Sequence, residues 1–278
     1  MITPAQEQLY AVIGNPVRHS LSPIMMNAAF RALGVAAHYT AFAVEHLAEA
    51  LQLLSQTGFR GLSVTLPHKE EACRWATELD ETARSIVAVN TLRRQGDHWD
   101  GRNTDWIGAV QALRQVTEVR GRNALVIGAG GSARAVIYGL KREGARVTVS
   151  NRTAQRGVEL AAAFQCHFLP FQDLQEQSYE LLVQCTPLGM EGTASAEALP
   201  DFPLSSQMVV MDLVYRPYWT PLLKRARDAG CQVVSGLDML LYQGVAQLEW
   251  WLGQPAPVAL MKEALWAALA KENDDSAH

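Results

Sequence analysis

Cysteine is scarce in this sequence, and its spacing argues against a disulfide framework. The chain has 278 residues but only four cysteines, Cys73, Cys166, Cys185 and Cys231, and no two of them form a CxxC pair. Thiols this far apart are typical of a reducing compartment, so we expect a cytoplasmic protein. The seven histidines show no HxxxH or HExxH spacing, so we expect no metal site.

Long hydrophobic runs and an excess of positive charge are also missing. No apolar run approaches the roughly 20 residues of a membrane-spanning helix, and the first segment, MITPAQEQLY, does not resemble a secretory signal. The formal net charge is −4, and Lys and Arg are scattered along the chain. We therefore expect binding neither to a membrane nor to a nucleic acid.

The residues that are present are typical of a globular α/β protein, since 49% are hydrophobic and 19% are charged. In the first part of the chain, apolar runs ended by Gly or Pro alternate with helical patterns. The expected strands are 10–16, 38–44 and 61–67, and the expected helices are 22–34, 47–58 and 68–79. For Ser22, which precedes Pro23, a role as N-cap of the following helix is the alternative to a role in binding. This alternation predicts a mostly parallel sheet, which a β-rich segment closes near residue 102.

The second part of the chain repeats the pattern of apolar runs ended by turn residues. Strands are expected in the segments ALVI (124–127), RVTVSNRT (146–153), YELLVQCTPLG (179–189), MVVMDLVY (208–215) and CQVVSG (231–236), and the pattern from residue 238 to about 270 is helical. The length suits two domains. We therefore expect two α/β lobes with a cleft between them, residues 1–102 forming the first and residues 103–237 a Rossmann-type, doubly wound parallel sheet.

A glycine-rich turn in the second lobe is the first candidate site. Gly128, Gly130 and Ala133 fit the GxGxxG/A fingerprint, and they follow an apolar strand and precede a helix. In this context the glycines allow a tight turn and let the backbone approach a pyrophosphate at a helix N-terminus. The alternative is a tight strand-to-helix turn without a ligand.

The end of the next strand lacks the acid that would select NAD. An Asp or Glu about 20 residues after the glycines accepts the ribose 2′-hydroxyl of NAD, whereas an Arg accommodates the 2′-phosphate of NADP. Here the chain has Ser150, Asn151, Arg152 and Thr153. A guanidinium forms charge-assisted hydrogen bonds to a phosphate, so we predict NADP. Alternatively, Asn151 and Arg152 are turn and helix-entry residues.

Polar residues also follow the expected strands of the first lobe, in the segments NPVRHSLSP, VTLPHK, AVNT and GRNTDWIG. Each of these residues alone fits turn chemistry. Together they place hydroxyl, amide, amine and carboxylate groups at strand ends, where open α/β sheets bind ligands. The residues are Ser20, Ser22, Thr65, Lys69, Asn90 and Asp105.

From end to end the chain resembles the shikimate dehydrogenase family. The similar motifs occur in the family's order: IGNPVRHSLSP, VTLPHK, AVNT, GRNTDWIG, GAGGSARA, NRT, CTPLGM, DLVYRPYWTPLL and GLDMLLYQG. The resemblance implies NADPH-dependent reduction of 3-dehydroshikimate to shikimate, a step of aromatic amino acid biosynthesis. It also implies that the first lobe is a substrate-binding domain, completed by the C-terminal helices 238–270.

The resemblance assigns roles to individual residues. Lys69 and Asp105 correspond to the family's catalytic pair, with Lys69 either transferring a proton or acting as an electrostatic clamp. Both are also expected to contact the substrate, together with Ser20, Ser22, Thr65, Asn90, Tyr215 and Gln243. The expected cofactor-binding residues are Gly128, Ala129, Gly130, Gly131, Ser132, Ala133, Asn151, Arg152, Thr153, Thr186, Gly236 and Met239. For Met239, core packing is an equally good interpretation.

Three positions depart from the family pattern. Ser63 and Gln184 stand where Asn is usual, and Met26 stands where His is common. Two other functions stay open: a quinate/shikimate dehydrogenase of broader specificity, often NAD-dependent, and a non-catalytic NADP-binding sensor. The retained Lys69 and Asp105 favour an enzyme over a sensor. The expected partner is a small-molecule substrate, and the protein is expected to be a monomer or a homodimer.

Overall fold

The chain folds into two α/β units, each built on its own six-stranded sheet. The computed structural model describes residues 7–176, 178–191, 199 and 202–275. The first unit comprises residues 1–104 and 243–278, and the second comprises residues 105–242. The sequence suggested boundaries after residues 102 and 237. The second boundary falls later because α9 (Gly236–Leu252) is a single helix whose first residues belong to the second unit.

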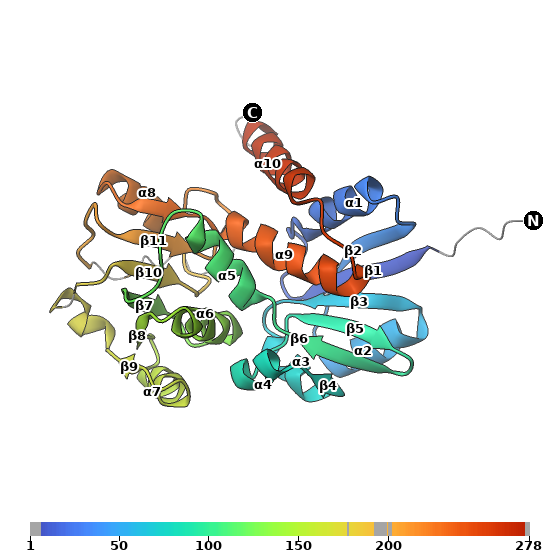
Figure 1. Ribbon diagram of the computed structural model, residues 1–278, viewed down its shortest axis with the longest axis horizontal. Coiled ribbons are helices and arrows are strands. Elements are labelled where there is room, and N and C mark those ends of the chain that lie inside the picture. The colour runs from blue at the N-terminus through green and yellow to red at the C-terminus, as the bar shows by residue number, and fades with distance from the viewer. Residues whose placement is uncertain (1–6, 177, 192–198, 200–201, 276–278) are drawn as a thin grey trace, which may run out of the picture. The chain divides into compact units, whose positions relative to one another are not determined.

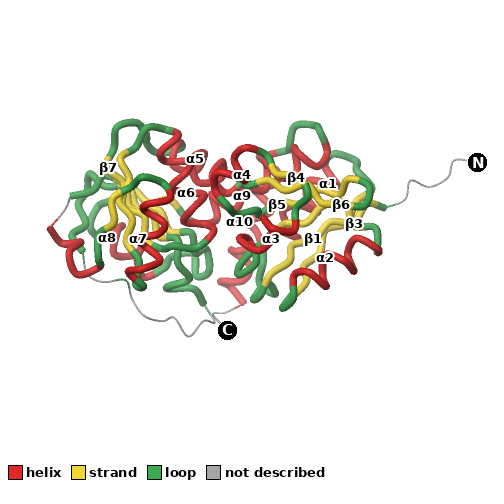
Figure 2. Tube along the Cα trace, turned by 90° about the horizontal axis from the view of Figure 1, so that it is seen from below, coloured by secondary structure: helices red, strands yellow, loops and turns green. Residues whose placement is uncertain are grey.

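The first unit has helices on both faces of its sheet. Its elements are β1 (Gln8–Gly14), α1 (Ser22–Ala32), β2 (Ala37–Ala43), α2 (Leu47–Gln56), β3 (Phe59–Val64), α3 (Lys69–Trp75), β4 (Glu78–Leu79), α4 (Glu81–Ile86), β5 (Thr91–Gln95), β6 (His98–Arg102) and α10 (Val258–Asp275). Helix α2 packs along β3, and α10 packs against α1 (Figures 1 and 2).

The sheet of the first unit has the strand order β2-β1-β3-β5-β6-β4. Strands β1, β2 and β3 are parallel, whereas β5 is antiparallel to both β3 and β6. Ala11 and Ile13 of β1 belong to the core cluster that contains Leu47 and Leu51 of α2. Tyr10, which precedes Ala11 and points to the opposite face of the strand, packs against Phe30 of α1, with ring centroids 5.1 Å apart. Burial on both faces explains why β1 is a continuous apolar run.

Two local interpretations for this unit are wrong. Helix α1 begins at Ser22, and its N-cap is Leu21 instead of Ser22. Helix α3 ends at Trp75 because the following residues form β4, which pairs in parallel with β6. The expected C-terminal helices are α9 and α10, and the chain leaves the helical conformation between them, where Gly253 has a φ of +66°.

The second unit alternates strands and helices almost without interruption. Its elements are α5 (Asp105–Arg114), β7 (Asn123–Ile127), α6 (Gly131–Arg142), β8 (Arg146–Ser150), α7 (Ala154–Ala163), β9 (His167–Phe168), the 3-10 helix η1 (Phe171–Glu176), β10 (Leu181–Gln184), β11 (Val209–Asp212), α8 (Pro221–Asp228), β12 (Gln232–Val234) and the start of α9.

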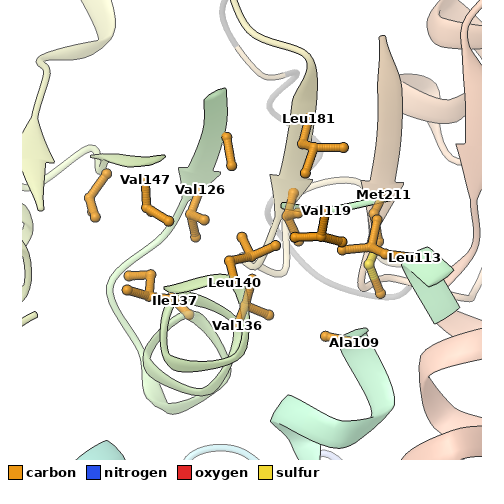
Figure 3. Close-up of a cluster of buried hydrophobic side chains, with 14 of the residues drawn as sticks. Ala109, Leu113, Val119, Val126, Val136, Ile137, Leu140, Val147, Leu181 and Met211 are labelled. Carbon is orange, nitrogen blue, oxygen red and sulfur yellow. The ribbon is translucent and has the colours of Figure 1, made fainter. Parts of the chain in front are cut away.

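All strand pairs of the second sheet are parallel, in the order β12-β11-β10-β7-β8-β9. This is the Rossmann order, so the predicted doubly wound parallel sheet is confirmed. Alternate strand residues face opposite layers. Val126 and Leu181 pack with Leu113 of α5 and Leu140 of α6, as Figure 3 shows. On the other face, Leu125 and Leu182 pack in the cluster that contains Leu222 of α8.

Candidate functional site

The glycine-rich turn of the second unit follows β7, the strand at which the strand order of the sheet reverses. Strand β7 is paired with both β8 and β10, and the loops that follow β7 and β10 meet at the carboxyl edge of the sheet. Gly128 has a φ of +121°, and its N–H donates to the Ser150 carbonyl oxygen at 2.9 Å. A Cβ atom at Gly128 would lie 3.1 Å from Cγ2 of Thr186. Such a switch point is where open α/β sheets bind dinucleotides.

The start of helix α6 fits a pyrophosphate group. Gly130 is the N-cap, no side chain caps the helix, and its first turn contains no acidic residue. A Cβ atom at Gly130 would have no neighbour within 4 Å, so there is open space above the turn. A helix N-terminus of this kind presents backbone N–H groups and the positive end of the helix dipole. The residues present therefore suit the phosphates of a dinucleotide.

The end of β8 is polar and has no carboxylate. The Ser150 side chain is buried and donates to the Leu169 carbonyl oxygen at 2.6 Å. The Asn151 amide donates to the Thr153 carbonyl oxygen at 2.9 Å, which closes the turn, while Arg152 and Thr153 are exposed. The first turn of α7 contains no acidic residue either. This edge is therefore suited to a negatively charged group.

Arg156 is a candidate residue that the sequence analysis missed. It lies in the first turn of α7, and its guanidinium Nη2 donates to the Ala129 carbonyl oxygen at 3.5 Å. An arginine is thus held against the glycine-rich turn. Its position in the first helical turn after the acid-free segment is the signal that would have revealed it.

Gln184 organises the turn that carries Thr186. Its side chain is fully buried at the end of β10 and donates to the carbonyl oxygens of Thr186 and Leu188 at 3.0 and 3.1 Å. Its amide oxygen accepts from the Thr186 backbone N–H. The side chain that is longer than the usual Asn therefore lies beneath the turn and braces it.

Asp212 is a buried carboxylate that supports the same turn. It accepts hydrogen bonds from Gln184 Nε2 at 3.3 Å, from the Val214 backbone N–H at 3.0 Å and from Thr220 Oγ1 at 2.6 Å. Burial raises the pKa of Asp212 from 3.8 to about 7, although the hydrogen bonds from Thr220 and Val214 oppose the rise. Asp212 thereby ties the end of β11 to the loop after β10.

Asp212→Asn is expected to change how stability depends on pH. Because its folded-state pKa of about 7 exceeds the unfolded value, the folded protein binds more protons between pH 4 and 7. The contribution of Asp212 to stability is therefore greatest at low pH and falls as the pH rises towards 7. Urea unfolding at pH 5 and pH 8 should show a smaller loss of stability with rising pH in the variant. Equal losses in the two proteins would contradict this assignment.

Gly236 and Met239 lie at the start of α9 in the second unit. A Cβ atom at Gly236 would lie 2.2 Å from the Leu213 carbonyl oxygen, so only glycine fits there. Met239 is 6% exposed and belongs to the core cluster of this unit, which agrees with the interpretation as a packing residue. Its proposed contact with the nicotinamide stays a prediction.

In the first unit, the segments that follow β1 and β3 lie side by side. The Thr65 backbone N–H donates to the Ile13 carbonyl oxygen at 2.9 Å, and the Asn15 N–H donates to that of Leu66 at 2.9 Å. A Cβ atom at Gly14 would lie 2.3 Å from Cγ2 of Thr65. Glycine at this position therefore brings Thr65 close to the loop that leads to Ser20.

The two serines are close to each other at the start of α1. The Ser22 backbone N–H donates to Oγ of Ser20 at 3.3 Å, and Ser22 is buried while Ser20 is partly exposed.

Met26 lies one turn further along α1. It is fully buried beside Gly244 of α9, so methionine serves here as a packing residue.

Lys69 is the first residue of α3 and is partly exposed. Its carbonyl oxygen accepts from the Val89 N–H at 2.8 Å, which ties this turn to the segment that carries Asn90. The neighbouring His68 is buried, and its Nε2 lies 2.7 Å from the Val44 carbonyl oxygen. These contacts fix the backbone from which the Lys69 side chain projects.

Asn90 and Gln243 are brought together in a buried cluster. The Asn90 amide donates to Thr104 Oγ1 at 2.9 Å and to Gln243 Oε1 at 3.3 Å. Its oxygen accepts from the Thr104 backbone N–H at 2.7 Å. Gln247, one turn beyond Gln243 on α9, was missed by the sequence analysis, and it donates to the Asn90 carbonyl oxygen at 3.2 Å. The spacing of four residues between the two glutamines was the available signal.

Ser63 continues this cluster towards β2. The Tyr39 hydroxyl donates to Ser63 Oγ at 2.6 Å, and Ser63 donates to Gln247 Oε1 at 2.6 Å. Burial raises the pKa of Tyr39, although the hydrogen bond with Ser63 opposes the rise. The small Ser63 thus fits between Tyr39 and Gln247, and its buried hydroxyl forms a hydrogen bond with each of them. The polar groups at this departure from the family pattern are therefore paired.

Asp105 and Tyr215 belong to the second unit, whereas the other expected substrate-binding residues belong to the first. Asp105 is the first residue of α5 and is 4% exposed. Tyr215 follows β11 and is partly buried.

Among the described residues, no helix is both long and apolar enough to cross a bilayer.

The strand order, the glycine-rich turn at the switch point and the acid-free end of β8 define a dinucleotide-binding α/β protein. Residues 12–92 match the family described as "Shikimate dehydrogenase substrate binding domain". Residues 110–188 match "Shikimate / quinate 5-dehydrogenase", and residues 236–265 match "Shikimate 5'-dehydrogenase C-terminal domain".

Individual relatives agree with these matches. A "Shikimate dehydrogenase (NADP(+))" of Syntrophobacter fumaroxidans is 54% identical, and the alignment covers 99% of each chain. The Thermus thermophilus shikimate 5-dehydrogenase in complex with NADP(H) and shikimate is 38% identical, with a TM-score of 0.86 over 94% of this chain and 100% of that one. A shikimate dehydrogenase in complex with NADP+ is 34% identical, with a TM-score of 0.87 over 95% and 96%.

The chain belongs to the shikimate dehydrogenase family, as its motifs predicted.

Proposed function

We propose that this protein catalyses the reversible NADPH-dependent reduction of 3-dehydroshikimate to shikimate, in the biosynthesis of aromatic amino acids. The observation that carries this proposal is the full-length similarity to a relative named for this activity and this cofactor, at 54% identity. The acid-free end of β8, which is followed by the exposed Arg152, independently supports NADP as the cofactor.

The second unit supplies the proposed cofactor site. Backbone N–H groups of the turn Gly128, Ala129, Gly130, Gly131, Ser132 and Ala133 would hold the pyrophosphate. Asn151, Arg152 and Thr153 would hold the 2′-phosphate, and Thr186, Gly236 and Met239 would line the nicotinamide side. NADPH supplies the hydride when it is bound, and the protein's part is to orient it.

The proposed substrate contacts use donors and acceptors suited to a carboxylate and several hydroxyls. They are Ser20, Ser22, Thr65, Asn90, Tyr215 and Gln243, together with Lys69 and Asp105. A polar site of this kind rejects analogues that leave its groups unpaired. Lys69 Nζ would hold or transfer a proton at the carbonyl oxygen of the substrate as this oxygen becomes a hydroxyl. Asp105 is the second member of the catalytic pair.

Two further parts of the proposal concern the setting of the enzyme. The four cysteines form no disulfide, which supports a cytoplasmic protein. A small-molecule substrate is its expected partner, and the protein would act as a monomer or a homodimer that binds neither nucleic acid nor a membrane.

Steady-state kinetics with four pairs of substrates test this function. Values of kcat/KM for shikimate and for quinate, each with NADP and with NAD, should be highest for shikimate with NADP. Comparable values for quinate would support a quinate/shikimate dehydrogenase. Binding of NADP without turnover of either compound would support a non-catalytic sensor.

Lys69 and Asp105 are expected to be non-additive if they serve one catalytic step. The double variant Lys69→Ala with Asp105→Asn should be little slower than the slower of the two single variants. The measurement is kcat for the wild type, both single variants and the double variant. Losses that add fully in log kcat would instead assign the two residues independent roles.

A further inference from the structure

A cavity in the first unit shares no residue with the proposed catalytic and cofactor sites. It has a volume of about 590 Å³ and is lined by Arg60, Arg93 and Arg94 together with Tyr10 and Trp251. It lies at the amino ends of β1 and β3, whereas Thr65 follows the carboxyl end of β3. A second cavity, of about 270 Å³, shares two of these arginines, Arg60 and Arg94.

A β-bulge displays Arg60 at the rim of this cavity. Leu9 pairs with Phe59 and Tyr10 pairs with Gly61, so Arg60 has no opposite residue on β1. Bulges of this kind redirect a side chain. The Arg60 side chain is exposed, and within the described residues it forms no hydrogen bond or ion pair. Its positive charge opposes the burial that raises the pKa of Tyr10 to about 12, which places the guanidinium near this ring.

Arg94 also has a hydrogen-bond donor that is not used by the described residues. Its Nη1 is buried and has no hydrogen-bond partner among the described residues. Its Nη2 lies 3.7 Å from the carboxylate of Asp97, a side chain that is fully exposed, so this ion pair is weak. An oxyanion at hydrogen-bond distance would be a better partner for this guanidinium than Asp97.

Arg93 and Arg94 are both held in place: Arg94 Nε donates to the Gly96 carbonyl oxygen at 2.5 Å and its guanidinium lies 5.5 Å from the centre of the Trp99 ring. The Arg93 guanidinium lies 4.6 Å from the centre of the Trp250 ring and donates to the Trp250 carbonyl oxygen at 3.3 Å. Its Nη2 is 3.6 Å from the Asp100 carboxylate. Arg93 therefore contributes a fixed positive wall, and Arg60 and Arg94 contribute the donors. The remaining nearby carboxylate, Glu7, lines only the smaller cavity.

The aromatic side of the cavity is rigid. The Trp251 indole N–H donates to the Leu92 carbonyl oxygen at 3.0 Å, and the ring lies 5.1 Å from that of Tyr10. A Cβ atom at Gly61 would lie 2.6 Å from the Trp251 ring, so glycine lets the indole lie directly on β3. Tyr10 is only 2% exposed beneath this ring, so Trp251 is the aromatic surface that a flat ligand would contact.

We propose that this cavity binds a small organic anion, with its oxyanion group between Arg60 and Arg94 and a planar ring against the partly exposed Trp251. The volume of about 590 Å³ lies within the range of small-molecule sites. Planar guanidinium groups match the geometry of phosphate and carboxylate oxygens. The site is independent of the proposed dehydrogenase function, because none of its residues belongs to that machinery.

Titration calorimetry with phenyl phosphate, which joins a planar ring to an oxyanion, tests the proposal. The full-length protein should bind phenyl phosphate, and Arg60→Gln should weaken binding about 10-fold or more, since a charged hydrogen bond is lost. Arg60→Gln with Arg94→Gln should abolish it at millimolar ligand. Inorganic phosphate should bind more weakly than phenyl phosphate, because it lacks the ring.

Matched variants separate this site from general charge effects and from the cofactor site. Arg31→Gln removes an equal charge from the exposed last turn of α1 in the same unit and should leave binding unchanged. Arg152→Ala should also leave it unchanged, and a loss confined to that variant would place the ligand at the cofactor site and overturn the proposal. Unaltered binding in the double variant, no binding by the wild type, or equal binding of inorganic phosphate would overturn it as well.

Discussion

Lys69→Ala is expected to lower kcat by roughly 10²-fold or more, which is the usual contribution of a general acid. The Lys69 backbone is fixed between the Thr65 turn and Val89, so removing the side chain should leave the fold intact. KM for the substrate should change less than kcat, because the lost interaction develops in the transition state. Steady-state kinetics with saturating NADPH measure both constants.

Arg74→Ala is the control for this variant. Arg74 is an exposed basic residue in the last turn of the same helix, so its loss changes the charge of α3 equally without touching the proposed site. It should retain wild-type kcat. Near-normal kcat in Lys69→Ala would remove this lysine from the mechanism, and a shared loss in both variants would point to the charge or stability of α3.

Arg152→Ala is expected to weaken NADP binding by about 10- to 150-fold, because a hydrogen bond to a charged group contributes roughly 1.5 to 3 kcal/mol. The exposed Arg152 follows β8 at the acid-free edge of the sheet. NAD lacks the 2′-phosphate, so its affinity should change little. The value of kcat at saturating NADP should also persist, since the contact lies outside the reacting ring. Fluorescence titration with both nucleotides measures the change.

Two comparisons sharpen this experiment. Arg146→Ala removes an arginine at the opposite end of β8 and should leave both affinities unchanged. High salt should weaken NADP binding more in the wild type than in Arg152→Ala, because screening acts on a charge pair that the variant lacks. Equal losses for NADP and NAD would show that Arg152 supports the fold or the adenine and does not recognise the phosphate. Arg156 also lies at this edge, where its Nη2 donates to the Ala129 carbonyl oxygen, so we expect it to retain part of the phosphate affinity in Arg152→Ala.

The sequence by itself determined the features that depend on neighbouring residues. The glycine spacing predicted the turn from β7 into α6. A tight turn into a helix without a side-chain cap needs particular residues within a few positions of one another. The missing acid after β8 is likewise a local feature. Family membership was evident from the order of several motifs, and the comparisons confirm it.

Local patterns failed where distant backbone competed for the same residues. Residues 78–79 continue a helical pattern, but they form β4 because β6 offers them strand pairing. Ser22 has the chemistry of an N-cap, yet the chain turns one residue earlier, at Leu21. At residues 78–79 the tertiary strand pairing outweighs an intrinsic helix preference of at most about 1 kcal/mol.

Only the tertiary structure revealed the buried polar residues that support the candidate site, such as Gln247 and Asp212. Gln247 contacts Ser63, which is 184 positions away in the sequence, and Asp212 meets Gln184 across two adjacent strands. In a helical or strand pattern such residues are single polar positions with no visible partner. Their importance arises because a buried donor or acceptor must find its complement in the folded chain, and the sheet order and the placing of α9 determine which one it finds.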